Sequence, residues 1–329
     1  MNRLGGASRW LRRREFHVAA VLLLTVAVVG TVNPGFLAPG NVRDMLVNCA
    51  PTAIIACGVT LVMLTGEIDI SVGSLMGLLA ATVGLLTSVR HGGLPVYAGV
   101  GLTLLLAAGV GLANGLLVTV TRIPSIIVTL AMLTALRGAT TLLMGGEWVT
   151  DLPPDLRFLG TGQVLGLPVS IWMVIAVVAF SVVLARRTPL GRRIYAVGSN
   201  PRSAETVGLS PRRVRLFVFA ATGLLTGVAT LVSAPRLSVI EAGTGRGLEL
   251  LVVTCVVVGG TSISGGRGTI LGSMLGVVLM GIIGTVLIYL RLGETATYWE
   301  RAVQGTFILL AVLADHLARR RRAAEEAAS

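Results

Sequence analysis

The chain has 329 residues, of which 54% are hydrophobic and 13% are charged. Its mean hydropathy of +0.86 is far above that of a soluble globular protein. The net charge is +12, and all 27 basic residues are arginines because the sequence contains no lysine. The absence of lysine excludes a Walker A phosphate loop and a Schiff-base enzyme. The arginines lie between apolar runs rather than on a solvated face with aromatic readers, which argues against nucleic-acid binding.

Apolar runs long enough to cross a bilayer, about twenty residues each, recur along the whole chain. They predict transmembrane segments near 16–32, 45–65, 71–89, 94–120, 125–144, 168–185, 214–234, 248–264, 268–290 and 299–316. The runs 71–89 and 248–264 are rich in glycine and serine, so re-entrant or broken helices beside a cavity are the alternative there. The expected fold is all-α, a single membrane domain over 1–329 with about ten transmembrane helices.

The arginines predict how the chain crosses the membrane, because short cytoplasmic loops collect positive residues. With a cytoplasmic amino terminus, nineteen arginines fall in inner segments and seven in outer segments. We therefore expect both termini in the cytoplasm and 186–215 as the main cytoplasmic loop.

The middle of this loop has the residue pattern of a short capped helix. Asn200 can cap the amino end, and Pro201 suits the first helical position. Glu205 favours the helix dipole, and Gly208 can end the helix in a left-handed conformation. An ordinary solvated loop, enriched in arginine by the topology, explains the same residues equally well.

The sequence predicts no metal site and no enzyme active site. The three cysteines lie inside apolar runs, and the three histidines lie at the edges of spans without metal-ligand spacing. No nucleophile and base pair stands out along the chain. We therefore expect no catalytic residue, no metal ligand and no cofactor.

Arg137 lies well inside the predicted span 125–144, where a charge is costly and requires a partner. Glu249 is the preferred candidate, with Glu147 and Asp44 as alternatives. The hypothesis is an ion pair between Arg137 and Glu249 that holds the helices of the membrane domain together.

Glu67 and Asp69 precede the apolar run that starts at Ser71, so they are expected at a helix amino terminus. Carboxylates in that position stabilise the helix dipole and cap free amides. A direct part of Asp69 in a gate at the inner surface is the alternative. The spacing Gly-x-x-x-Ile-Ser-x-Gly occurs at 66–73 and again at 259–266, through either an internal duplication or coincidence in a chain with 42 glycines.

Four glycine-containing blocks stand out in order along the chain. They are Leu64–Ser74, then Asn114-Gly115 with Ile123–Leu130, then Gly198–Asn200 with Gly208, and Gly259–Ser262 with Gly265–Gly268. Together they resemble the permease subunits of bacterial ATP-binding-cassette importers for ribose, xylose, rhamnose and autoinducer-2. The resemblance covers nearly the whole chain. Glu67 departs from the family pattern, in which many relatives have a second glycine.

The resemblance implies a permease subunit in the bacterial cytoplasmic membrane that forms the pathway for a monosaccharide or sugar-like compound. It implies a separate ATPase subunit, an extracytoplasmic substrate-binding protein, and a second permease that is either a copy of this chain or a paralogue. Membrane lipid is the remaining expected partner of this chain. Gly146–Trp148, Leu152-Pro153 and Tyr298-Trp299 are most similar to the autoinducer-2 and rhamnose branches, with ribose and xylose as alternatives.

The resemblance also implies two groups of functional residues. Those expected to couple to the ATPase are Gly198, Asn200, Pro201, Ala204, Glu205 and Gly208. Those expected at the gate or pathway are Asp69, Ser71, Gly73, Asn114, Arg137, Glu249, Gly259 and Gly260.

An ion-coupled secondary transporter is the rival hypothesis from another class. Such a protein would be expected to bury acidic or histidine residues near the middle of the membrane. The acidic residues of this chain are predicted near the ends of spans, which disfavours that hypothesis.

Overall fold

A computed structural model describes residues 14–290, 299, 302–307, 309–310 and 313. Helices dominate the described chain. In order they are α2 (Arg14–Val32), η1 (Pro34–Leu37), α3 (Pro39–Leu64), α4 (Val72–Thr87), α5 (Val96–Thr121), α6 (Ser125–Met144), α7 (Pro154–Thr161), α8 (Val169–Arg187), α9 (Pro189–Ser199), α10 (Pro201–Thr206), α11 (Pro211–Ser233), η2 (Ala234–Arg236), α12 (Leu248–Val258), α13 (Ile270–Gly281) and α14 (Ile283–Tyr289). A two-stranded hairpin, β1 (Gln163–Val164) and β2 (Leu167–Pro168), follows α7.

Within the described residues, seven helical stretches are long and apolar enough to cross a membrane. They are Glu15–Val32, Pro39–Leu64, Val96–Thr121, Ser125–Met144, Val169–Arg187, Pro211–Arg236 and Ile270–Tyr289. The prediction of an all-α polytopic membrane protein is confirmed. The two glycine- and serine-rich segments, predicted as spans with re-entrant or broken helices as the alternative, are shorter apolar helices, α4 and α12. The last predicted span, 299–316, lies largely outside the described residues.

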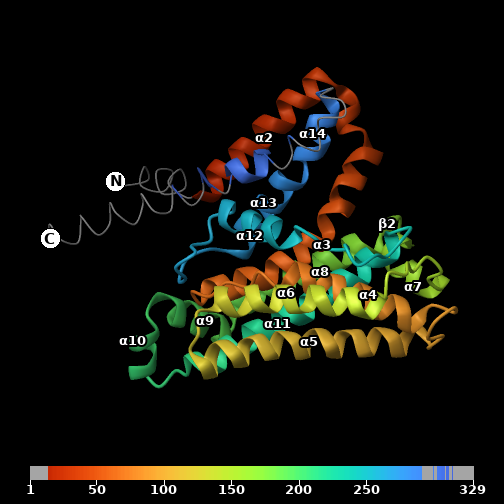
Figure 1. Ribbon diagram of the computed structural model, residues 1–329. Coiled ribbons are helices and arrows are strands. Elements are labelled where there is room, and N and C mark those ends of the chain that lie inside the picture. The colour runs from red at the N-terminus through yellow and green to blue at the C-terminus, as the bar shows by residue number, and fades with distance from the viewer. Residues whose placement is uncertain (1–13, 291–298, 300–301, 308, 311–312, 314–329) are drawn as a thin grey trace.

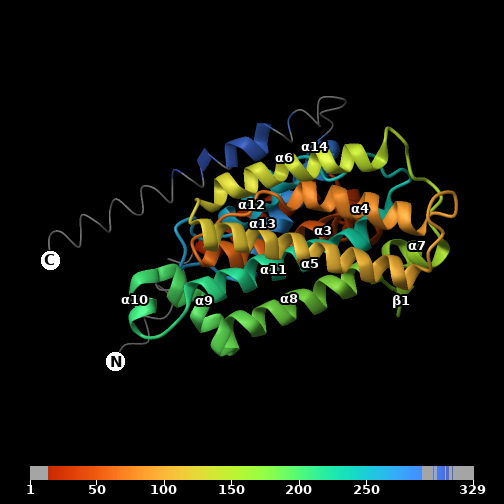
Figure 2. The ribbon, with the colours of Figure 1, turned by 60° about the horizontal axis from the view of Figure 1, so that its bottom comes forward.

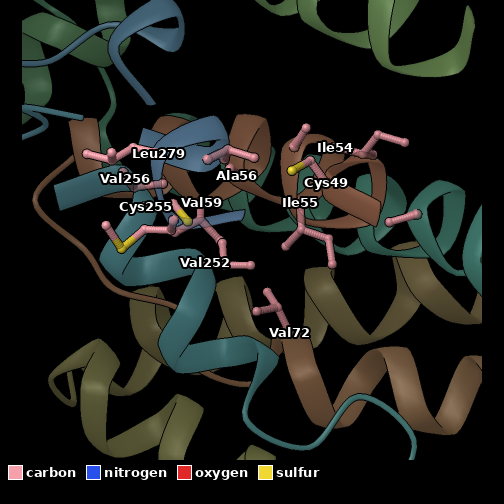
Figure 3. Packing of buried hydrophobic residues seen from close by; sticks show 14 of the residues in the cluster. Cys49, Ile54, Ile55, Ala56, Val59, Val72, Val252, Cys255, Val256 and Leu279 are labelled. Atoms are coloured by element: carbon pink, nitrogen blue, oxygen red, sulfur yellow. The ribbon is translucent and has the colours of Figure 1, made fainter. Parts of the chain in front are cut away.

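The short connecting segments between the long helices lie at two opposite ends of the bundle (Figures 1 and 2). The short helices α9 and α10 lie at one end, and α7 with the hairpin lies at the other. Helix α11 packs along α5 and α3, whereas α2 packs against α13. The main core forms where α3, α12 and α13 meet, and Figure 3 shows Val59, Cys255 and Leu279 converging there.

The sequence marks the helix boundaries at the α10 end with a repeated local signal. A capping side chain is followed directly by proline at the starts of α9, α10 and α11: Thr188-Pro189, Asn200-Pro201 and Ser210-Pro211. In each case the side chain accepts a hydrogen bond from a first-turn amide, and proline costs nothing there because its missing N–H would be unpaired anyway.

Between η2 and α12 the chain returns into the bundle as a non-helical segment alongside α4. Ile240 pairs with Val149 through a backbone bridge near the α7 end. Further along, a Cβ on Gly77 of α4 would lie 2.6 Å from the Thr244 carbonyl oxygen. The segment reaches the first turn of α4, where Gly73 lies against Gly245 and Glu249. Glycines on this face of α4 therefore leave room for a second backbone.

Helix α12 consequently starts inside the bundle, with its amino end beside the amino end of α4. Its eleven residues cover only about 17 Å. The two short helices thus diverge from a shared point, an arrangement of half-helices that membrane proteins tolerate only where protein or a cavity surrounds the irregular backbone.

Candidate functional site: a junction of glycine-containing segments

Three of the four glycine-containing blocks meet at the α10 end of the bundle. The Gly266 amide donates a hydrogen bond to the Leu64 carbonyl oxygen at 2.9 Å. Gly198 of α9 packs on the same carbonyl so closely that a Cβ there would overlap it. A Cβ on Gly265 would lie 2.7 Å from the Gly66 amide nitrogen and 2.9 Å from the Gly198 carbonyl oxygen. We call the contact of these five residues the glycine junction.

A side-chain hydrogen bond supports the glycine junction from α9. The Tyr195 hydroxyl donates to the Gly268 carbonyl oxygen at 2.9 Å. The close contacts are between backbones, so no flexible side chain lies between α9 and its neighbours to absorb a displacement. A movement of α9 therefore passes directly to the end of α3 and to the loop 265–268.

The short helix predicted between Asn200 and Gly208 is present as α10. The Asn200 side chain accepts a hydrogen bond from the Ser203 amide at 3.0 Å, and Gly208 has a φ of +78°. Ala204 is buried and its amide bonds to the Asn200 carbonyl, whereas Glu205 and the two residues after it are exposed. Helix α10 therefore presents a firm, solvent-facing surface that α9 joins to the glycine junction.

Asp69 lies in the non-helical segment before α4, within a buried polar network. Its carboxylate accepts hydrogen bonds from the amide and hydroxyl of Ser71 at 2.9 and 2.7 Å. The Ser71 hydroxyl in turn accepts from the Asn114 side chain at 2.9 Å. The capping interpretation needs correction, because Asp69 bonds to the residue that precedes α4 rather than to the first-turn amides. All three side chains are buried.

The neighbouring acid, Glu67, has a partner that sequence reasoning missed. Its Oε1 lies 2.9 Å from Nε of Arg215 on α11, an ion pair without an aligned hydrogen bond. From the sequence, Arg215 was only one of the arginines that predict the cytoplasmic loop 186–215. No local pattern connects residues this far apart, so only the fold reveals that Glu67 ties the end of α3 to the start of α11.

The structure replaces the expected direct pair between Arg137 and Glu249 with another set of partners. Arg137 Nη1 donates to the carbonyl oxygens of Ala242 and Thr244 at 3.2 and 2.9 Å. Glu249 makes no ion pair with Arg137; its Oε1 accepts from the Gly247 amide, and Oε2 lies against Gly73. The charge on Arg137 therefore satisfies the carbonyls of the non-helical segment, which have no helical partner at this depth.

Replacing Arg137 with methionine is expected to lower the free energy of unfolding by about 1–3 kcal/mol, because two partly buried carbonyls lose their donor. Thermal unfolding in nanodiscs would measure this loss. Arg187→Met, on the exposed last turn of α8, is the matched control. The exchange Arg137→Glu with Glu249→Arg is not expected to restore stability. Equal stability of the Arg137 and Arg187 variants would contradict this account.

The remaining gate candidates lie at the far end of α12 and do not join the Asp69 network. Gly259 packs against α13, where a Cβ would lie 2.6 Å from the Ser273 Cα, and Gly260 has a φ of +97°. The structure thus groups Asp69 with Ser71 and Asn114, and Gly73 with Glu249, but leaves Gly259 and Gly260 apart from both groups.

Comparison with known proteins identifies the family. Residues 41–312 match the family described as branched-chain amino acid transport system / permease component. The chain is 34% identical to the ribose import permease protein of Haemophilus influenzae, over 94% of both chains. It is 39% identical to the ribose import permease protein of Bacillus subtilis, over 89% of this chain and 90% of that one. It is 34% identical to the autoinducer 2 import system permease protein of Yersinia enterocolitica, over 91% of this chain and 81% of that one.

These matches extend over nearly the whole membrane domain and agree with the resemblance carried by the four glycine-containing blocks. The chain belongs to this family of permease subunits of bacterial ATP-binding-cassette importers, and it is a multi-pass transport protein of the cytoplasmic membrane.

Proposed function

We propose that this chain forms the membrane pathway through which an ATP-driven importer carries a monosaccharide or sugar-like compound into the cell. Relatives named as ribose and autoinducer 2 import permeases support the sugar-like class. Within that class rhamnose or autoinducer-2 is favoured, with ribose and xylose as alternatives. The proposed topology has ten membrane segments with both termini in the cytoplasm, which makes the α10 end the cytoplasmic end.

The observation that best supports energy coupling is the position of α10. It is exposed, it is capped at both ends, and through α9 it is joined to the glycine junction. In this proposal a separate ATPase subunit docks on α10. The coupling element consists of Gly198, Asn200, Pro201, Ala204 and Glu205, and it ends at Gly208. Movement of the ATPase then reaches the end of α3 and the loop 265–268 through backbone contacts.

The pathway is proposed to run beside the two half-helices. Asp69, Ser71 and Asn114 would hold the amino end of α4, and Arg137 with Glu249 would hold the non-helical segment before α12. Gly73 permits the close approach of the two helix ends, and Gly259 and Gly260 permit the turn after α12. A change in any of these contacts would alter the opening between the helices.

The proposed assembly contains a second permease, identical or paralogous, together with the ATPase and an extracytoplasmic substrate-binding protein, in contact with membrane lipid. An ATPase and a binding protein are the partners that the family implies. The second permease would complete a pathway between two bundles.

Uptake into proteoliposomes that hold the complete assembly tests this function. ATP inside the vesicles and loaded binding protein outside should both be required for sugar accumulation. Uptake by this chain alone on an ion gradient, without nucleotide, would instead establish a secondary transporter and overturn the proposal.

A further inference from the structure

An apolar groove of about 580 Å³ lies between α3, α8 and α13. Its described wall consists of alanine, aliphatic and methionine side chains, together with the thiol of Cys49. Three large side chains of this wall, Leu46, Ile175 and Leu271, remain 44–50% exposed, so the groove opens to the outside of the described bundle. We call it the α8 groove. Its wall offers no hydrogen-bonding side chain to a soluble polar ligand apart from the weakly polar thiol.

The α8 groove faces the bilayer rather than the interior of the protein. All three helices that bound it belong to stretches apolar and long enough to cross a membrane, and α8 lies at the edge of the bundle (Figure 2). Among the described residues after α14, Gln304 and Gly305 line a different cavity, on the face of α3 that presents Thr52. These residues therefore do not cover the α8 groove.

The length of the α8 groove matches one leaflet of a bilayer. On α8 its wall runs from Ile171 to Val182 with the spacing of one helix face. These residues span about 16 Å along the helix axis, which is close to half of a hydrocarbon core of about 30 Å. A membrane-crossing helix would need a contact along the full core. A single acyl chain, which occupies one leaflet, fits the observed length.

An arginine stands where the groove reaches the α10 end of the bundle. Arg186 follows Val182 by four residues, so it continues the same face of α8 about 6 Å beyond the apolar wall. Its side chain is exposed and has no ion-pair partner within the described residues. Arg186 is therefore placed at the level where a lipid chain in the groove would have its headgroup.

The acidic group nearest to this position is already engaged. Arg186 and Glu15 both act electrostatically on Tyr195 of α9, so the two charges lie near each other. The Glu15 carboxylate accepts a hydrogen bond from the Thr269 hydroxyl at 2.5 Å, just before the first turn of α13. The exposed arginines at this end of the bundle outnumber that single acid; in addition to Arg186 they are Arg187, Arg192 and Arg193. The headgroup position is therefore electropositive and suits a phosphate.

We propose that the α8 groove binds one acyl chain of an anionic phospholipid, whose phosphate group is held by Arg186. General contact with the bilayer selects no headgroup, whereas this site does. The inference does not depend on the transported compound. A chain in the groove fills the space between α8 and α13, and α13 follows directly on the loop 265–268 of the glycine junction. The bound lipid thus holds α13 in place against α8.

Lipid retention tests the headgroup part of the site. The full-length chain would be taken from nanodiscs of equal parts phosphatidylglycerol and phosphatidylcholine into a neutral detergent, and its bound lipid measured by native mass spectrometry. The wild type is expected to retain phosphatidylglycerol over phosphatidylcholine by roughly threefold or more, and Arg186→Ala to lose this preference. Arg187→Ala is the matched control, because this exposed arginine lies about 100° further round α8. Equal retention of the two lipids by the wild type, or equal losses in both variants, would overturn the inference.

Filling the groove tests the acyl-chain part of the site. Ala179→Trp places a large side chain in the groove, and it is expected to lower the retained phosphatidylglycerol roughly threefold or more. Ala176→Trp is the matched control, because Ala176 is also exposed on α8 but does not line the groove. Equal retention by the two variants would contradict the site. A change in oligomeric mass on size exclusion with light scattering for Ala179→Trp, with retained lipid unchanged, would assign the groove to a second copy of the chain instead.

Thermal unfolding separates a bound lipid from one that merely adheres to the surface. Phosphatidylglycerol added to the delipidated wild type is expected to raise the unfolding midpoint by about 2 °C or more, since a ligand that binds only the folded state stabilises it. Phosphatidylcholine should have a smaller effect, and Arg186→Ala and Ala179→Trp should abolish the difference between the two lipids. Equal midpoints in the two lipids for the wild type would show adventitious retention only and refute the proposal.

Discussion

Gly198→Ala is expected to abolish ATP-driven uptake. The added methyl group would overlap the Leu64 carbonyl oxygen and would lie 2.6 Å from the Gly266 amide nitrogen. Both obstacles are backbone, so no side chain can rotate away to make room. The backbones that meet at the glycine junction must move apart, which lowers the free energy of unfolding by about 1–3 kcal/mol or more. Uptake should fall below a tenth of the wild-type rate, and the ATPase should no longer respond to loaded binding protein.

Gly138→Ala is the matched control for this substitution. Gly138 lies inside α6 and has open space where the methyl group would go. Its replacement should leave uptake intact and raise helix stability slightly, since alanine is the better helix former by about 1 kcal/mol. The account of the glycine junction fails if Gly198→Ala and Gly138→Ala transport at the same rate.

Disrupting α10 is expected to have an effect of similar size. Ala204→Pro removes the amide that bonds to the Asn200 carbonyl, and proline within a helix costs about 3 kcal/mol. Gly208→Val places a branched residue at a φ of +78°, a conformation that such side chains disfavour. Both changes should abolish ATP-driven uptake while the protein stays folded in the membrane, because α10 contains only six residues at the edge of the bundle.

Gly166→Val is the matched control for Gly208→Val. Gly166 has the same φ of +78° and the same open surroundings, but it lies in the hairpin at the opposite end of the bundle. The control should transport normally, with the two α10 variants inactive and all three retained in a monodisperse peak on size exclusion. Normal uptake by both α10 variants would rule out a coupling role for this helix.

The long helices could be predicted from the sequence because apolar length is a direct consequence of bilayer thickness. The capped helix α10 could be predicted because its signals are local, with Asn200, Pro201 and Gly208 all within one short segment. Composition left re-entrant or broken helices open as the alternative at 71–89 and 248–264, where the structure has the shorter helices α4 and α12. The path of the segment before α12 was not predictable, since it depends on glycines of α4 that carry no periodic signal.

The partner of Arg137 was missed for a different reason. Reasoning from residue types looks for an opposite charge, and Glu249 was the natural choice. The structure instead uses the carbonyls of Ala242 and Thr244, which every sequence contains and no sequence pattern marks. The glycine junction escaped prediction in the same way, because contacts between backbones leave no trace in side-chain chemistry.

Helix α3 runs from a cavity that Thr52 lines to the glycine junction, so a tilt of this helix would move residues at both places. From Thr52 at the cavity wall to Leu64 at the junction is about 18 Å along the helix axis. Pro51, next to Thr52, lies where the helical hydrogen-bond ladder is already interrupted, so α3 is expected to bend at this point. A tilt of about ten degrees there corresponds to a displacement of roughly 3 Å at Leu64. A displacement of atomic size at the α10 end would therefore be enough to reorient the residues of α3 around Thr52.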